Sequence, residues 1–393
     1  MKIFRFYMML CLCLFFVTAS KAYNIIGKVV TIENPAGIAD VYVFINNTQK
    51  YAITDSLGNF SLLNVPEKYF DIVVYKKGFE KLIFRYGPED IGHTIKFELE
   101  KAKTDSALIQ PDSLIRFNLK RWSAVFMTGF IGDTKNAESE VLNPEVLRFY
   151  LDSLHHKLTI RATDQIHIIN ESLGYLVNIC LTEFVQEEKT ISFDKQVFYK
   201  PLSSKSVELQ AKWREKRSGL YKGSLLHFMR SLYKNNLEAE GFILKTVKRI
   251  DPAELNIVKN YEVLTQYQPV FINDTTNMTV HYKVMVARQA IKPAELLKVD
   301  TDNNLVYFAS KDPVQVTYKN GYLPYEYLHS IGYETYALQK QTSFLSTPDS
   351  FRIVIQPSGR YLETSNIFVD GFWGWQNVFI RLPFDYEEFL KAE

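Results

Sequence analysis

Short apolar runs separated by turn-forming residues fill the chain between residues 24 and 100. The runs are rich in β-branched and aromatic side chains, and Gly, Pro, Asn and Asp separate them, which is typical of consecutive short strands. The predicted strands are Ile25 to Ile32, Val41 to Ile45, Tyr51 to Thr54, Phe60 to Leu63, Phe70 to Tyr75, Lys81 to Phe84 and Thr94 to Leu99. Seven strands in so short a stretch predict a small β-sandwich.

One turn in this region has a definite physical role. Between Thr54 and Phe60, the Asp55 side chain can accept hydrogen bonds from the backbone amides that follow it, and Gly58 can adopt positive φ at low cost. We therefore predict that Asp55 and Gly58 are structural residues of the turn. Phe60 then begins the next strand with its ring toward the core.

The pattern changes after residue 100. Residues 101–122 are polar at first and predict a linker, and beyond them helix and strand patterns are mixed. A helix is predicted at 143–154, where Asn can cap the first turn and Pro suits its first position. A longer helix is predicted at 205–236, because apolar residues recur there at intervals of three and four. The predicted strands are Lys157 to Ala162, His167 to Ile169, Tyr175 to Val185, Thr190 to Phe198, Gly241 to Val247, Met278 to Ala287, Leu305 to Ala309, Val314 to Tyr318 and Phe351 to Ile355.

The N-terminus predicts export. Two basic residues precede Phe6 to Val17, a run of 12 apolar residues. As a helix this run would span roughly 18 Å, well short of the roughly 30 Å hydrocarbon core of a bilayer. Ser20 and Ala22 then place small side chains at the −3 and −1 positions of a signal-peptidase site. Residues 1–22 are therefore predicted to be a signal peptide, cleaved between Ala22 and Tyr23.

Length, charge and cysteine content narrow the class of protein. A chain of 393 residues is expected to form two or three domains. Loss of residues 1–22 changes the formal charge from +2 to −1, which disfavours a nucleic-acid-binding protein. Of three cysteines only Cys180 would remain, so the mature chain can form no internal disulfide. Its apolar neighbours predict that Cys180 is a small buried hydrophobic residue.

The usual catalytic motifs are missing from the sequence. A zinc carboxypeptidase needs a His followed three positions later by Glu, and no histidine of this chain has that neighbour. Ser224 and His227 would share one helical turn, but no Gly-x-Ser-x-Gly elbow surrounds the serine. Helix packing is the favoured account of this pair, and no catalytic residue, metal ligand or cofactor is predicted.

Two sets of residues are weak binding candidates. Arg214 and Arg217, on the predicted basic helix, suit the phosphates of anionic lipid or lipopolysaccharide, although a solvated helix face explains them as well. Trp373 and Trp375 suit stacking against sugar rings, although aromatic residues at this density also serve to close a core.

Five ordered elements of the N-terminal region carry a resemblance to a known family. They are Gly27-Lys28-Val29, the hairpin Ala36 to Val41, Thr54-Asp55-x-x-Gly58-x-Phe60, Val65-Pro66 and Gly78-Phe79. This order resembles the carboxypeptidase-regulatory-like family of transthyretin-type (prealbumin-like) β-sandwiches. The resemblance implies a structural or docking module without catalytic residues, of the kind that precedes many outer-membrane receptors of the Bacteroidetes.

The later part of the chain carries a second set of matching elements. They are Asn143 to Leu147, Asn170-x-x-Leu173-Gly174-Tyr175, the segment Trp213 to Leu232, Gly371-Phe372-Trp373-Gly374 and Leu382-Pro383-x-Asp385-Tyr386. These are similar to the body of Bacteroidetes envelope proteins that are named for their carboxypeptidase-like regulatory domain. The resemblance spans nearly the whole mature chain and implies a setting in the cell envelope, but no chemistry.

The sequence therefore predicts an α+β multidomain protein. Its parts are a signal peptide (1–22), a seven-stranded transthyretin-like β-sandwich (23–100), a linker (101–122) and a mixed α+β body (123–393). The predicted function is non-catalytic docking or binding in the periplasm or at the periphery of the outer membrane, with an outer-membrane receptor, another envelope protein or a glycan as partner. No nucleic acid and no transmembrane span after signal cleavage are expected. The alternatives are an envelope hydrolase acting on peptides or glycans through dispersed residues, and a glycan-binding protein.

Overall fold

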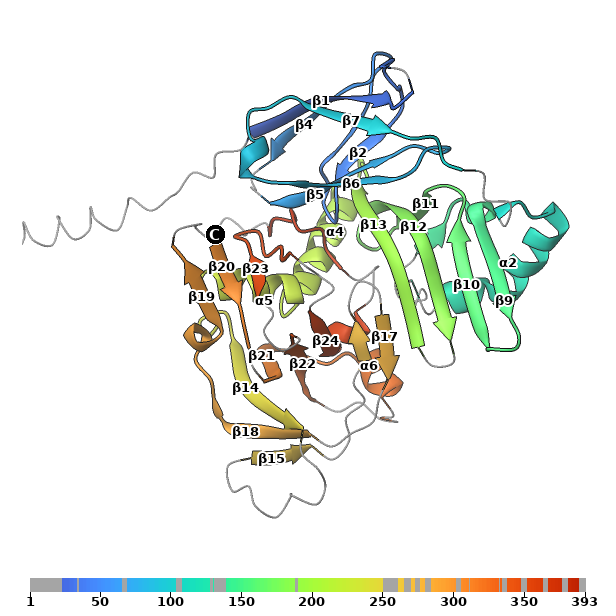
Figure 1. The fold of residues 1–393 in the computed structure, drawn as a ribbon. Coiled ribbons are helices and arrows are strands. Elements are labelled where there is room, and N and C mark those ends of the chain that lie inside the picture. The colour runs from blue at the N-terminus through green and yellow to red at the C-terminus, as the bar shows by residue number, and fades with distance from the viewer. Residues whose placement is uncertain are drawn as a thin grey trace, which may run out of the picture.

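The protein is strand-rich and builds several sheets (Figure 1). The computed structural model describes residues 23–33, 35–65, 69–103, 108–127, 130, 139–187, 190–249, 261–264, 270–272, 276–279, 284–301, 305–310, 312–331, 333, 338–347, 352–362, 367–376 and 381–388. The predicted signal peptide, with Ala22, lies outside these residues, and Tyr23 begins the first strand.

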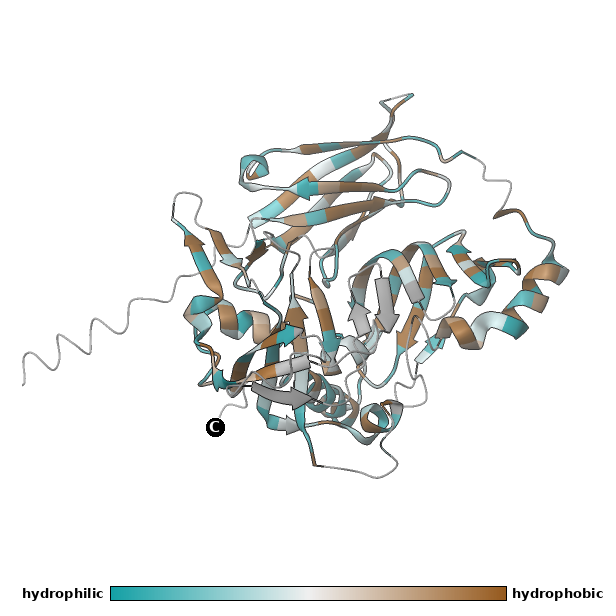
Figure 2. Ribbon diagram, turned by 60° about the horizontal axis from the view of Figure 1, so that its bottom comes forward, coloured by the Kyte–Doolittle hydropathy of each residue, from teal (hydrophilic) through white to brown (hydrophobic). Residues whose placement is uncertain are grey.

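The first seven strands form two sheets, which we call the N-terminal sheets. Their bounds are β1 (Tyr23–Thr31), β2 (Tyr42–Ile45), β3 (Tyr51–Ile53), β4 (Asn59–Val65), β5 (Phe70–Tyr75), β6 (Leu82–Tyr86) and β7 (Ile95–Leu99). The strand orders are β4-β1-β7 and β3-β2-β5-β6. One apolar cluster, which includes Val29, Phe60 and Ile72, draws residues from both sheets. The alternation of apolar and polar residues that builds such a core can be followed along these strands in Figure 2.

The turn before β4 is fixed by one carboxylate and one glycine. Asp55 accepts backbone hydrogen bonds from Leu57 (2.9 Å) and Asn59 (2.8 Å), and its other oxygen accepts one from the Asn59 side chain (3.0 Å). The side-chain and backbone hydrogen bonds from Asn59 lower the pKa of Asp55 below its ordinary value. Gly58 has a φ of +82°, and its Cα faces the backbone of Val29 and Gly37 with no room for a side chain. Residue 58 is therefore restricted to glycine by both conformation and space.

The rest of the described chain, which we call the body, contains one long sheet and one small sheet. The long sheet has 14 strands in the described residues, and its main path runs β15-β18-β14-β21-β22-β24-β16-β17-β13-β12-β10-β9. The strands are β8 (Ser139–Val141), β9 (Leu147–Asp152), β10 (Lys157–Ala162), β11 (Ile166–Asn170), β12 (Tyr175–Glu187), β13 (Thr190–Pro201), β14 (Phe242–Arg249), β15 (Tyr261–Leu264), β16 (Val270–Ile272), β17 (Thr276–Thr279), β18 (Val284–Ala290), β21 (Val314–Tyr322), β22 (Lys340–Ser346) and β24 (Phe368–Gly371). The small sheet has the order β19 (Leu297–Asp300), β20 (Leu305–Phe308), β23 (Ile353–Ile355).

Helices pack on two parts of the long sheet. The described helices are α2 (Asp112–Phe126), α4 (Val207–Tyr221), α5 (Leu225–Tyr233), α6 (Tyr325–Ser330) and α7 (Phe372–Trp375), together with the short 3₁₀ turns η1 (Pro88–Asp90), η4 (Pro144–Val146) and η6 (Pro293–Glu295). α2 contributes to the core around β9–β13, and α5 contributes to the core around β14, β21 and β22. None of these helices combines the length and the apolar character that crossing a bilayer requires.

The helix predicted at 143–154 is wrong. A 3₁₀ turn at 144–146 leads directly into β9, whose residues Leu147 to Asp152 pair antiparallel with β10. Leu147 and Phe149 are buried and alternate with more exposed neighbours, so the period of the segment is two and not 3.6. Asn143 does not cap a helix, because its side chain donates to the Gln165 carbonyl and accepts from the His167 amide.

The helix predicted at 205–236 is two helices. α4 ends at Tyr221, and α5 begins at Leu225 after a turn in which Gly223 has a φ of +78°. Ser224 caps α5, since its hydroxyl oxygen accepts the backbone N–H of His227 at 3.1 Å. The three- and four-residue spacing of apolar side chains continues through this turn, so the sequence pattern did not indicate a break between two helices. The linker predicted at 101–122 is also interrupted, because α2 begins at Asp112 and its residues Leu119 and Trp122 pack on the body core.

The N-terminal sheets are fastened to the body through the loop between β2 and β3 and the face of β2 and β5. Backbone hydrogen bonds join Asn47 to the Val197 carbonyl (2.7 Å) and Tyr199 to the Thr48 carbonyl (2.9 Å), so this loop pairs with β13. Beside it, Phe44 and Val73 of the N-terminal sheets form a buried cluster with Cys180 and Phe198 of the body. Burial raises the pKa of the Cys180 thiol to about 12, in agreement with its prediction as a buried hydrophobic residue.

Residues 381–388, which we call the C-terminal segment, bind both parts. The Phe384 amide donates to the Asn47 carbonyl (2.8 Å), and the Asp385 carboxylate accepts the backbone N–H of Gln49 (2.9 Å). On the body side, the Arg230 guanidinium donates to the carbonyls of Phe384 (3.0 Å) and Tyr386 (2.7 Å). The segment runs between the N-terminal sheets and the helices α4 and α5 (Figure 1). It is therefore a third component of the contact between the sheets and the body.

Candidate functional site

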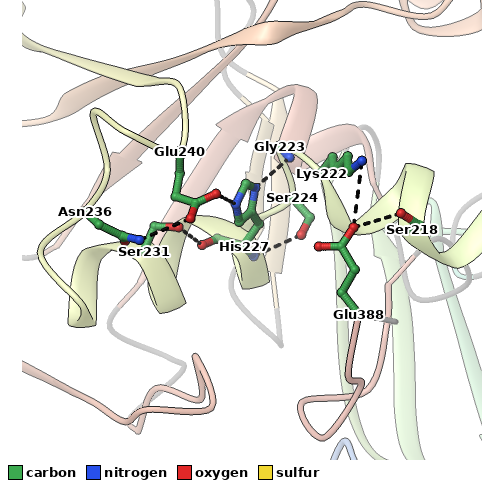
Figure 3. Close-up of polar contacts among 9 residues, drawn as sticks. All are labelled: Ser218, Lys222, Gly223, Ser224, His227, Ser231, Asn236, Glu240 and Glu388. Atoms are coloured by element: carbon green, nitrogen blue, oxygen red, sulfur yellow. Dashed lines mark hydrogen bonds and ion pairs between the residues drawn. The ribbon is translucent and has the colours of Figure 1, made fainter. Parts of the chain in front are cut away.

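His227 is the centre of a polar network at the corner between α4 and α5 (Figure 3). Its Nδ1 accepts the backbone N–H of Gly223 at 3.1 Å, and its Nε2 lies 3.1 Å from Glu240 Oε2. The ring is 5% exposed and is packed among the rings of Tyr221, Phe242 and Tyr318. A nitrogen that accepts from an amide cannot carry a proton, so the proton of the neutral ring is on Nε2 and is donated to Glu240.

Burial lowers the pKa of His227 below its ordinary value of 6.5, and the hydrogen bond and charge of Glu240 act in the opposite direction. The neutral form is thus the one that the fold selects. Protonation at Nδ1 would break the bond from Gly223 and place a second N–H against the first. The imidazole consequently holds the turn together, and neither nitrogen is available as a general base.

Acidification should weaken this corner. A histidine whose pKa is lower in the folded state binds its proton less tightly than the unfolded chain does, so its contribution is present above pH 6.5 and is lost as pH falls through the lowered pKa. We expect His227→Gln to reduce the loss of unfolding free energy between pH 7.5 and pH 5.0, measured by urea titration. His93→Gln, at an exposed position, should leave that loss as in the wild type. If the unfolding free energies of the two variants depended on pH equally, His227 would not be the group responsible for the loss of stability in acid.

Ser224 and His227 do not form a nucleophile and base. The Ser224 oxygen accepts the backbone N–H of His227, while the imidazole is bound to Gly223 and Glu240. Their proximity in sequence reflects the N-terminal cap of α5. Among the described residues, no three His, Cys, Asp or Glu side chains are grouped so that they could hold a metal ion.

An open polar pocket of about 520 Å³ lies beside this network. α4, α5, β21, β22 and the C-terminal segment all contribute to its wall. Its polar lining residues are Lys222, His227, Glu240, Asn320, Gln341 and Glu388. Two carboxylates and one ammonium group give the lining a small net negative charge when His227 is neutral. The pocket therefore offers many hydrogen-bonding groups without a strong electrostatic field.

The two carboxylates of the polar pocket are held in place by the protein. Glu240 accepts from the Asn236 side chain (3.1 Å) as well as from His227, and Glu388 accepts from the Ser218 hydroxyl (2.8 Å) and lies 3.9 Å from the Lys222 ammonium (Figure 3). Each carboxylate can accept further bonds. Gln341 adds an acceptor, because its Oε1 is buried and has no donor among the described residues. The pocket is thus preorganised to receive hydrogen-bond donors.

The arginines singled out in the sequence have different surroundings. Arg217 is half-buried and donates to the carbonyls of Leu173 (2.7 Å) and Gly174 (2.9 Å), with its guanidinium 4.0 Å from the Tyr175 ring centre. Arg214 is exposed on α4. The structure therefore does not bring the two guanidinium groups to one phosphate-sized site. Arg217 instead secures α4 against the turn before β12.

The tryptophans singled out in the sequence lie in or against the core. Trp373 is 3% exposed, and its indole N–H donates to the Gly223 carbonyl at 2.7 Å. Trp375 is partly buried and stacks on Phe372, with 6.0 Å between the ring centres. The ring of Trp373 is buried and presents no open face to a sugar. Their positions agree with the alternative considered for them, closure of a core.

Sequence reasoning did not find Glu240 and Glu388. They come from a loop and from the C-terminal segment, 148 positions apart in the chain, and no local spacing connects them. The one sequence signal near this site was the pair Ser224 and His227. It marks the corner between α4 and α5, but Ser224 serves there as the N-terminal cap of α5. No protein-family model matches the chain, and no curated protein matches it either.

Proposed function

We propose that this protein is a non-catalytic binding protein of the cell envelope and that it binds a neutral glycan in the polar pocket. The observation that carries the proposal is the set of fixed acceptors, Glu240, Glu388 and Gln341, beside the donors Lys222 and Asn320. A sugar hydroxyl is both a donor and an acceptor, so a sugar matches a lining of mixed type and low net charge. Bonds to ionised groups are also the stronger ones, which favours carboxylates as sugar ligands.

The non-catalytic part of the proposal follows from the state of His227. The residue best placed to move a proton in the pocket has one nitrogen occupied by a backbone N–H and the other by Glu240. Hydrolysis by two carboxylates remains the competing function. The two functions differ in what is released, because a hydrolase releases a cleaved glycan and a binding protein releases the glycan unchanged.

The setting in the envelope is part of the same proposal and rests on the sequence. Residues 1–22 have the features of a secretory signal peptide, and residues 23–100 resemble a carboxypeptidase-regulatory-like, transthyretin-type sandwich. Such a module would dock on a partner, which we propose to be an outer-membrane receptor or another envelope protein. Since the face of β2 and β5 is already covered by the body, the sheet β4-β1-β7 is the face open to such a partner.

The proposal is tested by screening the mature chain on an array of bacterial and host oligosaccharides and titrating the strongest hit by calorimetry. Glu388→Gln and Glu240→Gln keep the shape of the pocket and remove one charged acceptor each. We expect each to weaken binding at least tenfold, because a hydrogen bond to a charged group contributes about 1.5–3 kcal/mol. Glu238→Gln, an exposed neighbour outside the pocket lining, should bind like the wild type.

Three outcomes would reject the proposal. Glycan binding that survives both lining substitutions would place the site elsewhere, and an array without any hit would show that the protein does not bind these glycans. Release of new reducing ends during the titration, abolished by Glu240→Gln or Glu388→Gln, would make the protein a hydrolase. A melting curve of each variant establishes that the variant is folded before its affinity is compared.

A further inference from the structure

A polar contact between the N-terminal sheets and the body brings an amine, a carboxamide and a carboxylate together. They belong to Lys81, Gln196 and Asp194, and we call them the interface triad. Lys81 immediately precedes β6, and its Nζ donates to Gln196 Oε1. The other end of the same amide, Gln196 Nε2, donates to Asp194 Oδ1 at 3.0 Å. The three groups therefore form one hydrogen-bonded row, although Lys81 and Gln196 are 115 positions apart in the chain.

The strand geometry of β13 explains how two members of the interface triad meet the third. Asp194 and Gln196 are two positions apart on this strand, so their side chains project from the same face. Phe198, two positions further, packs on the N-terminal sheets, which identifies this face as the one that the sheets cover. The neighbouring strand β12 has a β-bulge at Thr182, and the Thr182 hydroxyl accepts a second bond from Lys81 Nζ at 2.6 Å. Bulges re-aim side chains in this way and often occur beside reactive groups.

The surroundings of Lys81 favour the neutral amine. Burial lowers the pKa of Lys81 below its ordinary value of 10.5, while the charges of Asp194 and Cys180 act in the opposite direction. The two hydrogen bonds from Nζ go to neutral groups, a hydroxyl and an amide, which stabilise an ammonium ion less than a carboxylate would. The neutral form, which has the electron pair of a nucleophile, is therefore more populated here than on a surface lysine.

Gln196 and Asp194 supply what acyl transfer to this amine requires. Gln196 is 7% exposed, so water has little access to its carboxamide, whereas Lys81 is in direct contact with it. Asp194 is exposed, and its carboxylate lies on the nitrogen that would have to leave. A carboxylate in this position can carry a proton from one nitrogen to the other. Its exposure also gives a released molecule of ammonia a way into the solvent.

We propose that Lys81 and Gln196 form an intramolecular isopeptide bond. Lys81 Nζ attacks Gln196 Cδ, and the electron pair of the carbonyl bond moves onto Oε1. Asp194 takes a proton from Nζ and gives it to Nε2. The carbonyl bond then re-forms, the Cδ–Nε2 bond breaks, and Nε2 leaves as ammonia. The products are one secondary amide and one molecule of ammonia, so no oxidant or other reactant is needed.

This bond would fasten the N-terminal sheets to the body covalently. It is a single event in which the chain modifies itself, and it does not depend on any ligand of the polar pocket. The mature chain has no second cysteine with which to form an internal disulfide. An isopeptide bond would provide a comparable cross-link, and reducing agents would not break it.

The test measures the intact mass of the purified mature chain. We expect a mass lower than that of the sequence by one molecule of ammonia. Trypsin should not cut after Lys81, and tandem mass spectrometry should find one branched peptide that joins Lys81 to Gln196. Lys81→Met and Gln196→Leu should each have the full mass of their sequences. Lys96→Met, at an exposed position of β7, is the matched control and should keep the loss of ammonia.

The role of Asp194 is tested by the rate of the reaction. Samples taken at intervals after cell-free synthesis give the fraction of chains that carry the branched peptide. We expect Asp194→Asn to form it at least tenfold more slowly, since a positioned proton carrier contributes roughly 10²–10⁴-fold to a rate. Glu187→Gln, at an exposed position of β12, should react at the rate of the wild type. An unchanged rate in Asp194→Asn would show that this carboxylate carries no proton.

Three results would overturn the isopeptide bond. They are an intact wild-type mass equal to that of the unmodified sequence, separate tryptic peptides for Lys81 and Gln196, and a loss of ammonia that Lys81→Met retains. The first two need no variant, so the test holds even if a substitution prevents folding. Cys180 also lies beside an amide, since Gln165 Nε2 is 3.4 Å from its Sγ. A loss of ammonia that disappears in Cys180→Ala and persists in Lys81→Met would assign the reaction to a thioester at that pair instead.

Discussion

Replacing Phe198 by alanine is expected to lower the free energy of unfolding by about 3–5 kcal/mol, as for other large aromatic residues in cores. Phe198 is 1% exposed, and its ring centre lies 4.7 Å from that of Phe44 and 5.0 Å from that of Tyr51. All of these partners belong to the N-terminal sheets. The substitution therefore removes an aromatic contact through which the body packs on the N-terminal sheets.

The measurement is chemical denaturation followed by tryptophan fluorescence, since the four tryptophans all lie outside the N-terminal sheets. Phe117→Ala is the control, because Phe117 is 58% exposed on α2 and its loss should change stability by less than about 0.5 kcal/mol. A double-mutant cycle with Phe44→Ala then isolates the coupling between the two rings. A loss below about 1 kcal/mol for Phe198→Ala would show that the sheets and the body are not fastened as described.

Gly58→Ala is expected to cost about 3 kcal/mol. A left-handed backbone costs a residue with a Cβ roughly 1–2 kcal/mol, and forced close contacts add roughly 1–3 kcal/mol. At Gly58 the φ is +82°, and a Cβ would lie 2.4 Å from the Val29 carbonyl oxygen and 2.8 Å from the Gly37 Cα. Both neighbours are backbone atoms and cannot rotate away.

Gly78→Ala is the matched control for Gly58→Ala. Gly78 has nearly the same φ, +85°, but a Cβ there would meet no atom within 4 Å. Its substitution should cost only the conformational part, about 1 kcal/mol. Denaturation midpoints give the stability loss of each variant. The loss at Gly58 in excess of the loss at Gly78 measures the cost of the close approach of residue 58 to the backbone of Val29 and Gly37. Equal losses at both positions would contradict the close approach of Gly58 to Gly37.

The positions of the N-terminal strands could be read from the sequence because the signal there is local. Each strand is a short β-branched or aromatic run bounded by turn residues, and β5 has the predicted bounds Phe70 and Tyr75. The partners of each strand were not accessible in this way. Some of these partners are far apart in the chain. β1 pairs in parallel with β7, and the β2–β3 loop pairs with β13.

The two errors in the body have the same origin, which is a pattern that fits two structures. Leu147 and Leu151 suit one face of a helix, but the alternation of Leu147 and Phe149 with polar neighbours suits a strand, and pairing with β10 decided the outcome. Tyr221, Leu225 and Phe228 keep helical spacing across a break that Gly223 and Ser224 create. Gly followed by Ser was the available signal for that break.

The candidate sites were largely hidden from sequence reasoning, because they are assembled from distant segments. Glu240 and Glu388 both line the polar pocket. This pair has no spacing that a motif could capture. The residues chosen from composition, Trp373 and Trp375, proved to lie in or against the core, where aromatic residues most often lie.

The contact between Gln49 and Asp385 joins residues 336 positions apart. During synthesis the N-terminal sheets emerge first and can fold as a unit while most of the body is still unmade. The amide of Gln49 meets its partner, Asp385, only after 336 further residues have been translated. The contact between the two parts can therefore be completed only after the C-terminal segment has been made. A nascent chain held before residue 381 should accumulate with folded N-terminal sheets and an incomplete joint, in a state open to protease at the loop between β2 and β3.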